Sequence, residues 1–495
     1  MSETARLLIP AVVADPNGRF EGARPAIMDA LALGVGGFAL YGGDQDAVRA
    51  LTRELQQKSR IPLLIGADME RGAGQQFGGA TGLPPLAAIA WLDDLEALRR
   101  AARLTAREAR TMGVNWTFSP VCDLDLEAAN PVLGTRVLGS DPERVGKLAV
   151  AWIEACQAEG VVACAKHFPG HGRTTADPHR ELPVVATDRD TLHATDLAPF
   201  RAVIQGGVAS MMAAHVSYPS LDPSGLPATL SRELLTWLLR QQMRYDGLLV
   251  ADGLQMGAVL QLADSEGDAA VRAIGAGCDV LLAPRDVAGT AEALERALAD
   301  RRLDPVRVEQ SVRRRLKWAQ WAAPPNDWRR PIAADAAWGA QLADRVVHVA
   351  RGAAPAIGGA IELVVVDDDA LATTDGVPES ASRLPSREPL ADTLRRAGVD
   401  VRAAGADAGT MPRVVALFGE VRPWKGRAGY APESLAAVRA ACDEAVAAGR
   451  GVVVLQFDHP RLIGTIPGDA PIVCGWSGDR AMQQAVARWL LARRG

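Results

Sequence analysis

Short apolar runs alternate with amphipathic segments through most of the N-terminal part of the chain. The runs are rich in valine, leucine, isoleucine and alanine, and glycine, proline, asparagine or aspartate ends most of them. Near-continuous apolar runs of this length are typical of strands buried on both faces, as in parallel sheets. We predict eight such strands, at residues 7–13, 37–41, 62–67, 115–121, 160–165, 210–216, 247–251 and 278–283.

Helices are predicted between these strands, because apolar positions recur there every three or four residues. They are expected at residues 24–33, 44–59, 95–112, 141–158, 192–205, 232–240 and 268–275. Eight alternating β and α units over about 300 residues have the size and order of a (β/α)8 TIM barrel. An open doubly wound sheet is the alternative, but the glycine-rich dinucleotide fingerprint after the first strand is missing.

The last third of the chain predicts a second, smaller α/β domain. Strands are expected at residues 362–366, 399–403, 414–418, 452–456 and 471–476, with helices near 388–397, 433–448 and 480–493. This order predicts a five-strand α/β layer. We therefore expect a barrel over residues 1–320, a linker over 321–335 and a C-terminal α/β sandwich-like domain over 336–495. Within that domain the polar loop 420–430 is predicted to be a surface turn, and approach to the barrel mouth is the alternative.

Composition and charge exclude some classes of protein. A chain that is 48% hydrophobic and 23% charged has ordinary globular composition, and its net charge of −5 offers no basic surface for nucleic acid. No stretch approaches the roughly 18 uninterrupted apolar residues of a membrane span. The first residues lack the basic start and apolar core of a signal peptide, and the six scattered cysteines form no Cys-x-x-Cys pair. We therefore expect a reduced, cytoplasmic protein without nucleic-acid or membrane partners, and the oligomeric state stays open.

Polar residues that directly follow strands are candidates for a site, because the strands of a barrel share one C-terminal mouth. They are Asp68 and Glu70, Asp123, Lys166 and His167, His215 and Asp252, with Arg136 added from loop 134–141. Asp252 ends a buried strand and is well placed to act as a nucleophile, and capping of the following helix is the alternative role. Asp68 and Asp123 have two open roles as well, substrate binding or capping.

The segment after the fifth strand, residues 166–183, is strongly polar although it directly follows a buried apolar run. It contains His167, His171 and His179, three of the seven histidines. Metal binding is one explanation of the cluster. Proline and glycine at positions 169 and 170 nevertheless interrupt the helix that a His-x-x-x-His pair needs, and no cysteine lies close enough to complete a tetrahedral set.

A proton-transfer unit is the other explanation. Pro178 favours an extended backbone at Asp177, and side chains two residues apart in an extended chain point the same way. The carboxylate of Asp177 can therefore bond one ring nitrogen of His179 and leave the other to exchange a proton with a substrate. A turn capped by Asp177, with His179 in solvent, is the alternative.

The motif KHFPGHG at residues 166–172, followed after four residues by Asp177-x-His179, resembles the signature of glycoside hydrolase family 3. The Asp-x-His form is similar to the β-N-acetylhexosaminidase branch of that family. Four further segments occur in the family's order and spacing, at residues 130–136, 212–216, 227–231 and 251–256. Five motifs in register are unlikely to arise by chance. The resemblance covers roughly residues 5–320 and implies the same (β/α)8 barrel.

The resemblance implies a retaining exo-glycosidase that forms a covalent glycosyl-enzyme. Its implied catalytic residues are Asp252 as nucleophile and His179 as general acid/base, paired with Asp177. The hydroxyl groups of the terminal sugar are then bound by Asp68, Arg136, Lys166 and His167. The implied substrate is a terminal β-linked N-acetylglucosamine on a muropeptide or chito-oligosaccharide, and no cofactor or metal is implied.

The chain departs from the family pattern in two places. Ala73 stands where an arginine is expected, with Arg71 two places earlier, and Pro178 stands where serine is common. Two alternatives within the family stay open: a β-glucosidase, and a β-N-acetylglucosaminide phosphorylase, because a histidine acid/base has no negative form to repel phosphate. Outside the family they are a metal-dependent barrel hydrolase, which a chelator would inactivate, and a non-catalytic sugar-binding protein.

Overall fold

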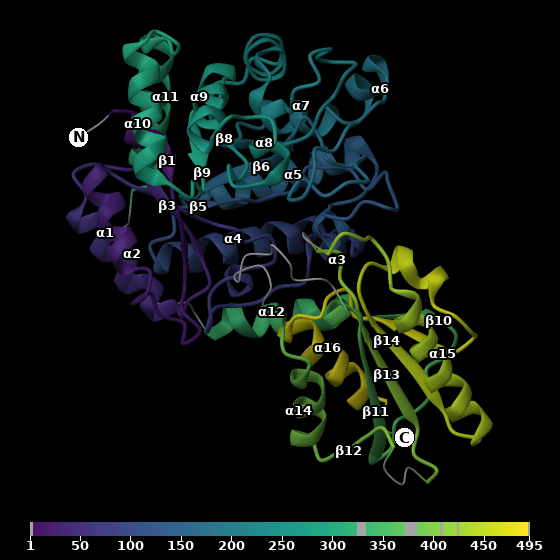
Figure 1. Ribbon diagram of the computed structural model, residues 1–495. Coiled ribbons are helices and arrows are strands. Elements are labelled where there is room, and N and C mark those ends of the chain that lie inside the picture. The colour runs from purple at the N-terminus through teal and green to yellow at the C-terminus, as the bar shows by residue number, and fades with distance from the viewer. Residues whose placement is uncertain (1–2, 324–332, 372–383, 406–408, 423–424, 494–495) are drawn as a thin grey trace. The chain divides into compact units, whose positions relative to one another are not determined.

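The computed structural model of the 495-residue chain describes residues 3–323, 333–371, 384–405, 409–422 and 425–493 (Figure 1). The chain forms two compact units. The first contains residues 1–81, 95–127 and 137–332, and the second contains residues 82–94, 128–136 and 333–495. Much of the expected linker, residues 321–335, lies outside the described residues, and the domain boundaries at 320 and 336 stay predictions.

The first unit is built on a sheet of nine parallel strands. In hydrogen-bonded order they are β1 (Leu8–Ile9), β9 (Val280–Leu282), β8 (Leu248–Ala251), β7 (Ser210–Ala213), β6 (Val162–Phe168), β5 (Trp116–Thr117), β4 (Leu64–Ala67), β3 (Gly37–Tyr41) and β2 (Ala11–Val13). Pro10 divides one predicted strand into β1 and β2, because proline has no amide hydrogen for the ladder. The strands at the two ends of this order, β1 and β2, are consecutive in the chain. Since β1 pairs with β9 and β2 pairs with β3, the sheet closes and the predicted barrel is confirmed.

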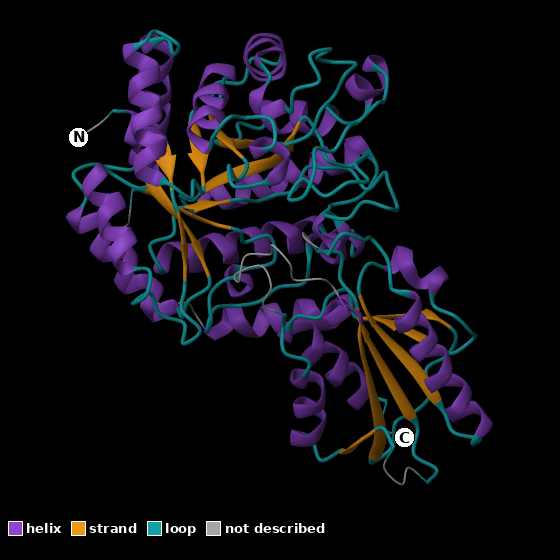
Figure 2. Ribbon diagram, viewed as in Figure 1, coloured by secondary structure: helices purple, strands orange, loops and turns teal. Residues whose placement is uncertain are grey.

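Helices surround this barrel, as Figure 2 shows. They include α1 (Arg24–Leu33), α2 (Gln45–Lys58), α4 (Leu95–Thr111), α5 (Pro142–Ala158), α6 (Arg189–Ala194), α7 (Ala198–Gln205), η5 (Glu233–Gln242), α9 (Glu266–Ala276), α10 (Val287–Ala299) and α11 (Pro305–Trp321). The single helix predicted over 192–205 is two helices, since Pro199 lies in the first turn of α7 and cannot continue α6. Segment η5 is a π-helix where an α-helix was expected.

The interior of the barrel is a packed core. Alternate residues of each strand point inward, for example Val162 and Cys164 of β6 and Leu248 and Val250 of β8. All six cysteines of the chain are buried and free, as predicted for buried thiols. Since the interior is filled, the side chains available for chemistry are those at the ends of the strands. In the described part of the chain, no helix has both the length and the apolarity needed to cross a membrane.

The second unit contains a mixed sheet with the order β10 (His348–Arg351), β15 (Ile472–Cys474), β14 (Val452–Phe457), β13 (Arg413–Phe418), β11 (Ala360–Asp367) and β12 (Asp400–Ala403). The five predicted strands are all present. The sequence analysis missed β10, which is antiparallel and carries no buried residue, so no apolar run marks it. Alternate residues of β13 enter different cores, with Val414 and Phe418 on one face of the sheet and Val415 and Leu417 on the other.

Helices cover both faces of this sheet. The core on one face includes residues of α3 (Leu86–Trp91), α12 (Ala333–Val346), α14 (Glu388–Arg396) and α16 (Arg480–Leu491). The core on the other face includes α15 (Pro432–Ala447). The second unit is therefore a three-layer α/β/α sandwich.

Candidate active site

The carboxyl-end rim of the barrel carries the predicted site residues of the first unit. Asp68 directly follows β4, and Asp252 directly follows β8. Lys166 and His167 lie inside β6, which continues to Phe168 and is longer than predicted. Because all these strands are parallel, their carboxyl ends share the rim at which active sites of this fold lie.

Lys166 joins two carboxylates at this rim. Its Nζ lies 2.6 Å from Oδ1 of Asp68 and 2.7 Å from Oε1 of Glu70. The side chain of Lys166 is 2% exposed and that of Asp68 is 26% exposed, so the pair extends from the interior of the barrel to its surface. The structure therefore brings Lys166 and Asp68 together and adds Glu70, whose backbone N–H is fixed by Oε1 of Gln75 at 2.8 Å.

Asp123 organises the loop of the KHFPGHG motif. Its Oδ1 accepts the backbone N–H groups of His167 and His171, at 3.1 and 2.6 Å. Its Oδ2 lies 2.7 Å from Nδ1 of His167. Burial raises the pKa of Asp123, but the two histidines around it outweigh this and the pKa is lowered overall. Since an ionised carboxylate only accepts hydrogen bonds, Nδ1 of His167 carries the proton and Nε2 is the atom available to a ligand.

The remainder of this loop is held by close backbone packing. A Cβ on Gly172 would collide with the backbone carbonyl of Leu124, which explains the second glycine of the motif. Nδ1 of His171 lies 2.5 Å from Oγ1 of Thr174. Burial lowers the pKa of His171 to about 4, so its ring is neutral at neutral pH. Among the described residues, no group of three or more His, Cys, Asp or Glu side chains is arranged to hold a metal ion.

Asp177 and His179 form the predicted pair. Nδ1 of His179 lies 2.7 Å from Oδ1 of Asp177, which also accepts the backbone N–H of His179 at 3.0 Å. The side chain of Asp177 is 2% exposed and that of His179 is 21% exposed, so the carboxylate is buried and the ring reaches solvent. The carboxylate therefore fixes the tautomer with the proton on Nδ1, and Nε2 is the nitrogen that can exchange a proton.

The loop that carries His179 packs on the segment that follows Asp252. The backbone carbonyl of His179 accepts from Gly257 N–H at 3.2 Å, and that of Pro178 accepts from Ala258 N–H at 3.1 Å. Gly257 and Ala258 begin α8 (Gly257–Leu260). The two predicted catalytic groups are thus connected through one short stretch of backbone.

We expect Gly257→Ala to move His179 out of position and to lower kcat by about 10- to 100-fold. The new Cβ would lie 2.9 Å from the carbonyl oxygen of Arg180 and 3.0 Å from that of His179, so the loop has to shift. Steady-state kinetics measures the change. Gly275→Ala in α9 is the control, because its Cβ meets only Leu303 at 3.7 Å and its activity should be unchanged. A Gly257→Ala enzyme with wild-type kcat would show that this packing does not position His179.

Asp252 is a partly buried carboxylate. Its Oδ1 accepts the backbone N–H of Gly253 at 2.7 Å. Burial raises its pKa, but His215, His167, the Gly253 N–H and His179 together lower the pKa to about 2. The carboxylate is therefore ionised at neutral pH. The capping alternative is wrong for the helix that follows, because the N-cap of α8 is Met256.

Tyr41 is a rim residue that the sequence analysis missed. It is the last residue of β3, and burial, reinforced by the charges of Asp68 and Asp252, raises the pKa of its phenol. The hydroxyl is therefore protonated and can donate a hydrogen bond. The predicted site residues follow their strands, whereas Tyr41 ends one, so its position at the last residue of a strand is the signal that could have identified it.

Arg136 lies in η3 (Gly134–Arg136), which groups with the second unit. Its NH1 donates to the carbonyl of Val132 at 2.9 Å. Its role in binding sugar stays a prediction.

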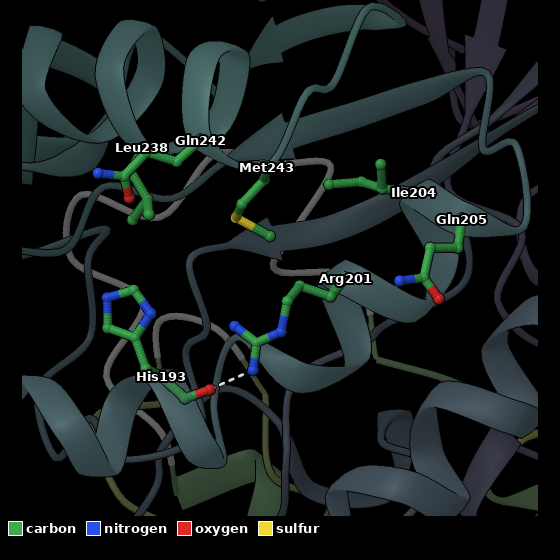
Figure 3. Close-up of a pocket in the computed structure, with 7 residues that line it drawn as sticks. All are labelled: His193, Arg201, Ile204, Gln205, Leu238, Gln242 and Met243. Carbon is green, nitrogen blue, oxygen red and sulfur yellow. Dashed lines mark hydrogen bonds between the residues drawn. The ribbon is translucent and has the colours of Figure 1, made fainter.

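A cavity of about 310 Å³ lies away from the rim residues, among α6, α7 and η5. Figure 3 shows Arg201 pointing toward His193, whose backbone carbonyl it hydrogen-bonds. None of the predicted site residues lines this cavity.

The fold and the rim together define a barrel enzyme with a candidate carboxylate nucleophile and a candidate Asp–His proton-transfer pair. The N-terminal domain of glycosyl hydrolase family 3 matches residues 31–317. The chain belongs to glycosyl hydrolase family 3, and both the resemblance noted in its sequence and the predicted glycosidase class are confirmed.

Individual relatives agree with this assignment. A β-N-acetylglucosaminidase/β-glucosidase from Cellulomonas fimi is 33% identical over 57% of this chain and 52% of its own length, so the chain spans about half of that relative. A β-hexosaminidase from Thiobacillus denitrificans is 38% identical over 52% of this chain and 73% of that protein. A solved family 3 β-N-acetylglucosaminidase from Paenibacillus sp. is 26% identical, with a TM-score of 0.84 over 100% of this chain and 96% of the other.

Proposed function

We propose that this protein is a retaining exo-glycosidase that releases terminal β-linked N-acetylglucosamine from oligosaccharides. The observation that carries the proposal is the Asp177–His179 pair, with Nδ1 and Oδ1 2.7 Å apart, in a loop packed on the segment that follows Asp252. The names of the relatives from Cellulomonas fimi, Thiobacillus denitrificans and Paenibacillus support the acetamido sugar.

In the first half of the reaction, Asp252 acts as the nucleophile. Its carboxylate attacks the anomeric carbon and forms an ester, while Nε2 of His179 gives its proton to the departing oxygen. The buried Asp177 orients the ring for this transfer, because its Oδ1 lies 2.7 Å from Nδ1 and leaves Nε2 as the nitrogen that transfers the proton.

In the second half, His179 acts as the base. Its neutral Nε2 takes a proton from water, the resulting oxygen attacks the anomeric carbon, and Asp252 leaves as a carboxylate. Two inversions at the same carbon return the β configuration. Phosphate in place of water would make the same residues a phosphorylase.

Binding of the terminal sugar is proposed for Asp68, Arg136, Lys166 and His167. Lys166 holds Asp68 at the rim, and Asp123 directs Nε2 of His167 away from itself. A carboxyl group, a lysine amine and an imidazole together supply acceptors and donors for neighbouring sugar hydroxyls. We further propose that the substrates are cell-wall or chitin fragments and that the enzyme is cytoplasmic, which the six buried free cysteines support.

The test compares 4-nitrophenyl N-acetyl-β-glucosaminide with 4-nitrophenyl β-glucoside, each with and without phosphate. We expect a preference for the acetamido sugar and no effect of phosphate or of a chelator. A preference for the plain glucoside would make the enzyme a β-glucosidase, and strong acceleration by phosphate would make it a phosphorylase. Loss of activity with a chelator would favour a metal-dependent hydrolase instead.

A further inference from the structure

Two residues of the sequence motifs, His215 and Thr229, have no part in the mechanism above. His215, in segment 212–216, and Thr229, in segment 227–231, follow β7 and belong to η4 (Ala228–Leu230), respectively. Nδ1 of His215 lies 2.7 Å from Oγ1 of Thr229, and its Nε2 lies 3.0 Å from the carbonyl oxygen of Gly253. His215 therefore contacts the residue that directly follows Asp252, and Thr229 contacts His215.

The protonation of His215 follows from these partners. A carbonyl oxygen only accepts, so Nε2 carries a proton and donates it to Gly253. Burial lowers the pKa of His215, which keeps the ring neutral at neutral pH. Nδ1 is then an acceptor for the hydroxyl of Thr229, which also lies 2.9 Å from the carbonyl oxygen of Ala214 and 3.3 Å from that of Ala213.

Gly253 also holds the side chain of Asp252. Its N–H donates to Oδ1 of Asp252 at 2.7 Å. His215 and Thr229 are fully buried, so water does not compete for these hydrogen bonds. A hydrogen-bonded chain thus runs from Thr229 through His215 and Gly253 to the carboxylate.

We propose that His215, oriented by Thr229, is a positioning residue for Asp252. It holds the carbonyl of Gly253, so that the amide of the same residue keeps Oδ1 of the carboxylate in place and Oδ2 is presented to the anomeric carbon. The inference rests on the proposed function, because it depends on Asp252 being the nucleophile. It assigns a role to two motifs whose side chains do not touch the sugar in the mechanism above.

The test measures the rate of ester formation per competent site. A slowly released fluorinated N-acetylglucosaminide titrates the active sites, and a stopped-flow burst of 4-nitrophenol gives the rate constant of the first step. We expect Thr229→Val, which has the shape of threonine without its hydroxyl, to lower that rate constant by about 10- to 100-fold with KM little changed. Thr229→Ser keeps the hydroxyl and should retain the wild-type rate within about threefold.

His215 provides a second matched pair. His215→Phe removes both hydrogen bonds and should slow ester formation at least as much as Thr229→Val, while His215→Gln restores part of the rate because its amide can donate to Gly253. A purely structural role would instead lower the number of titratable sites and leave the rate per site unchanged, which would overturn the inference. Wild-type rates in the variants would overturn the inference alone. Wild-type protein that forms no ester would overturn the proposed function itself.

Discussion

Asp252→Asn is expected to lower kcat on 4-nitrophenyl N-acetyl-β-glucosaminide by at least about 10⁴-fold. The wild-type carboxyl has a pKa of about 2, so the attacking group is ionised throughout the neutral and mildly acidic range. Asparagine has the same shape but no charge, and its amide cannot form the ester from which the sugar is later released. Steady-state kinetics measures the loss, and a mass increase on the peptide that contains residue 252 identifies the ester in the wild type.

The control for this substitution is Asp264→Asn. Asp264 is an exposed acid a short distance along the same segment, so the same chemical change should leave kcat within about twofold of the wild type. A thermal unfolding curve shows whether each variant is folded. If folded Asp252→Asn kept more than about a tenth of the wild-type activity, the nucleophile would have to be another residue, and the two-step mechanism would have to be abandoned.

The barrel could be predicted because parallel strands buried on both faces are nearly continuous apolar runs, and these are visible in the sequence. The errors in the fold have local physical causes. Pro10 splits the first strand, Pro199 divides a predicted helix, and the edge strand β10 is too exposed to leave an apolar signal. Pairing order and closure depend on contacts between distant strands, which periodicity does not contain.

The candidate site was partly predictable for a similar reason. Asp177 and His179 are two residues apart, so the extended backbone alone brings them together, and 2.7 Å separates their bonded atoms. The role of Asp123 in holding a loop that begins 43 residues later could not be predicted, because its partners His167 and His171 come from another strand end.

Buried ion pairs were also not predictable from the sequence. Loop 420–430 was predicted to be a surface turn, yet Lys425 is buried, with its Nζ 2.8 Å from Oδ2 of Asp368 and 3.0 Å from Oδ1 of Asp369. Residues 423 and 424 of the loop lie outside the described residues. A run of polar residues indicates solvent only when no partner of opposite charge is folded against it.

The Asp177–His179 pair is expected to act as one unit. Either Asp177→Asn or His179→Ala should lower kcat by about 10²- to 10⁴-fold, since proton transfer by a positioned side chain contributes about that much. Asparagine keeps the shape of Asp177 but removes the charge that holds Nδ1 protonated. The double variant should lose no more than about threefold beyond His179→Ala alone, because removing the orienting carboxylate has no effect once the imidazole is gone.

The leaving group separates this role from simple damage to the fold. A 2,4-dinitrophenyl leaving group needs no proton, so the rate of ester formation with that substrate should be nearly the same in His179→Ala and in the wild type. With a sugar as the leaving group, the same variant should show the full loss. If the double variant instead lost the product of the two single effects, Asp177 and His179 would be acting independently, and the carboxylate would contribute to the reaction by another route than the tautomer of His179.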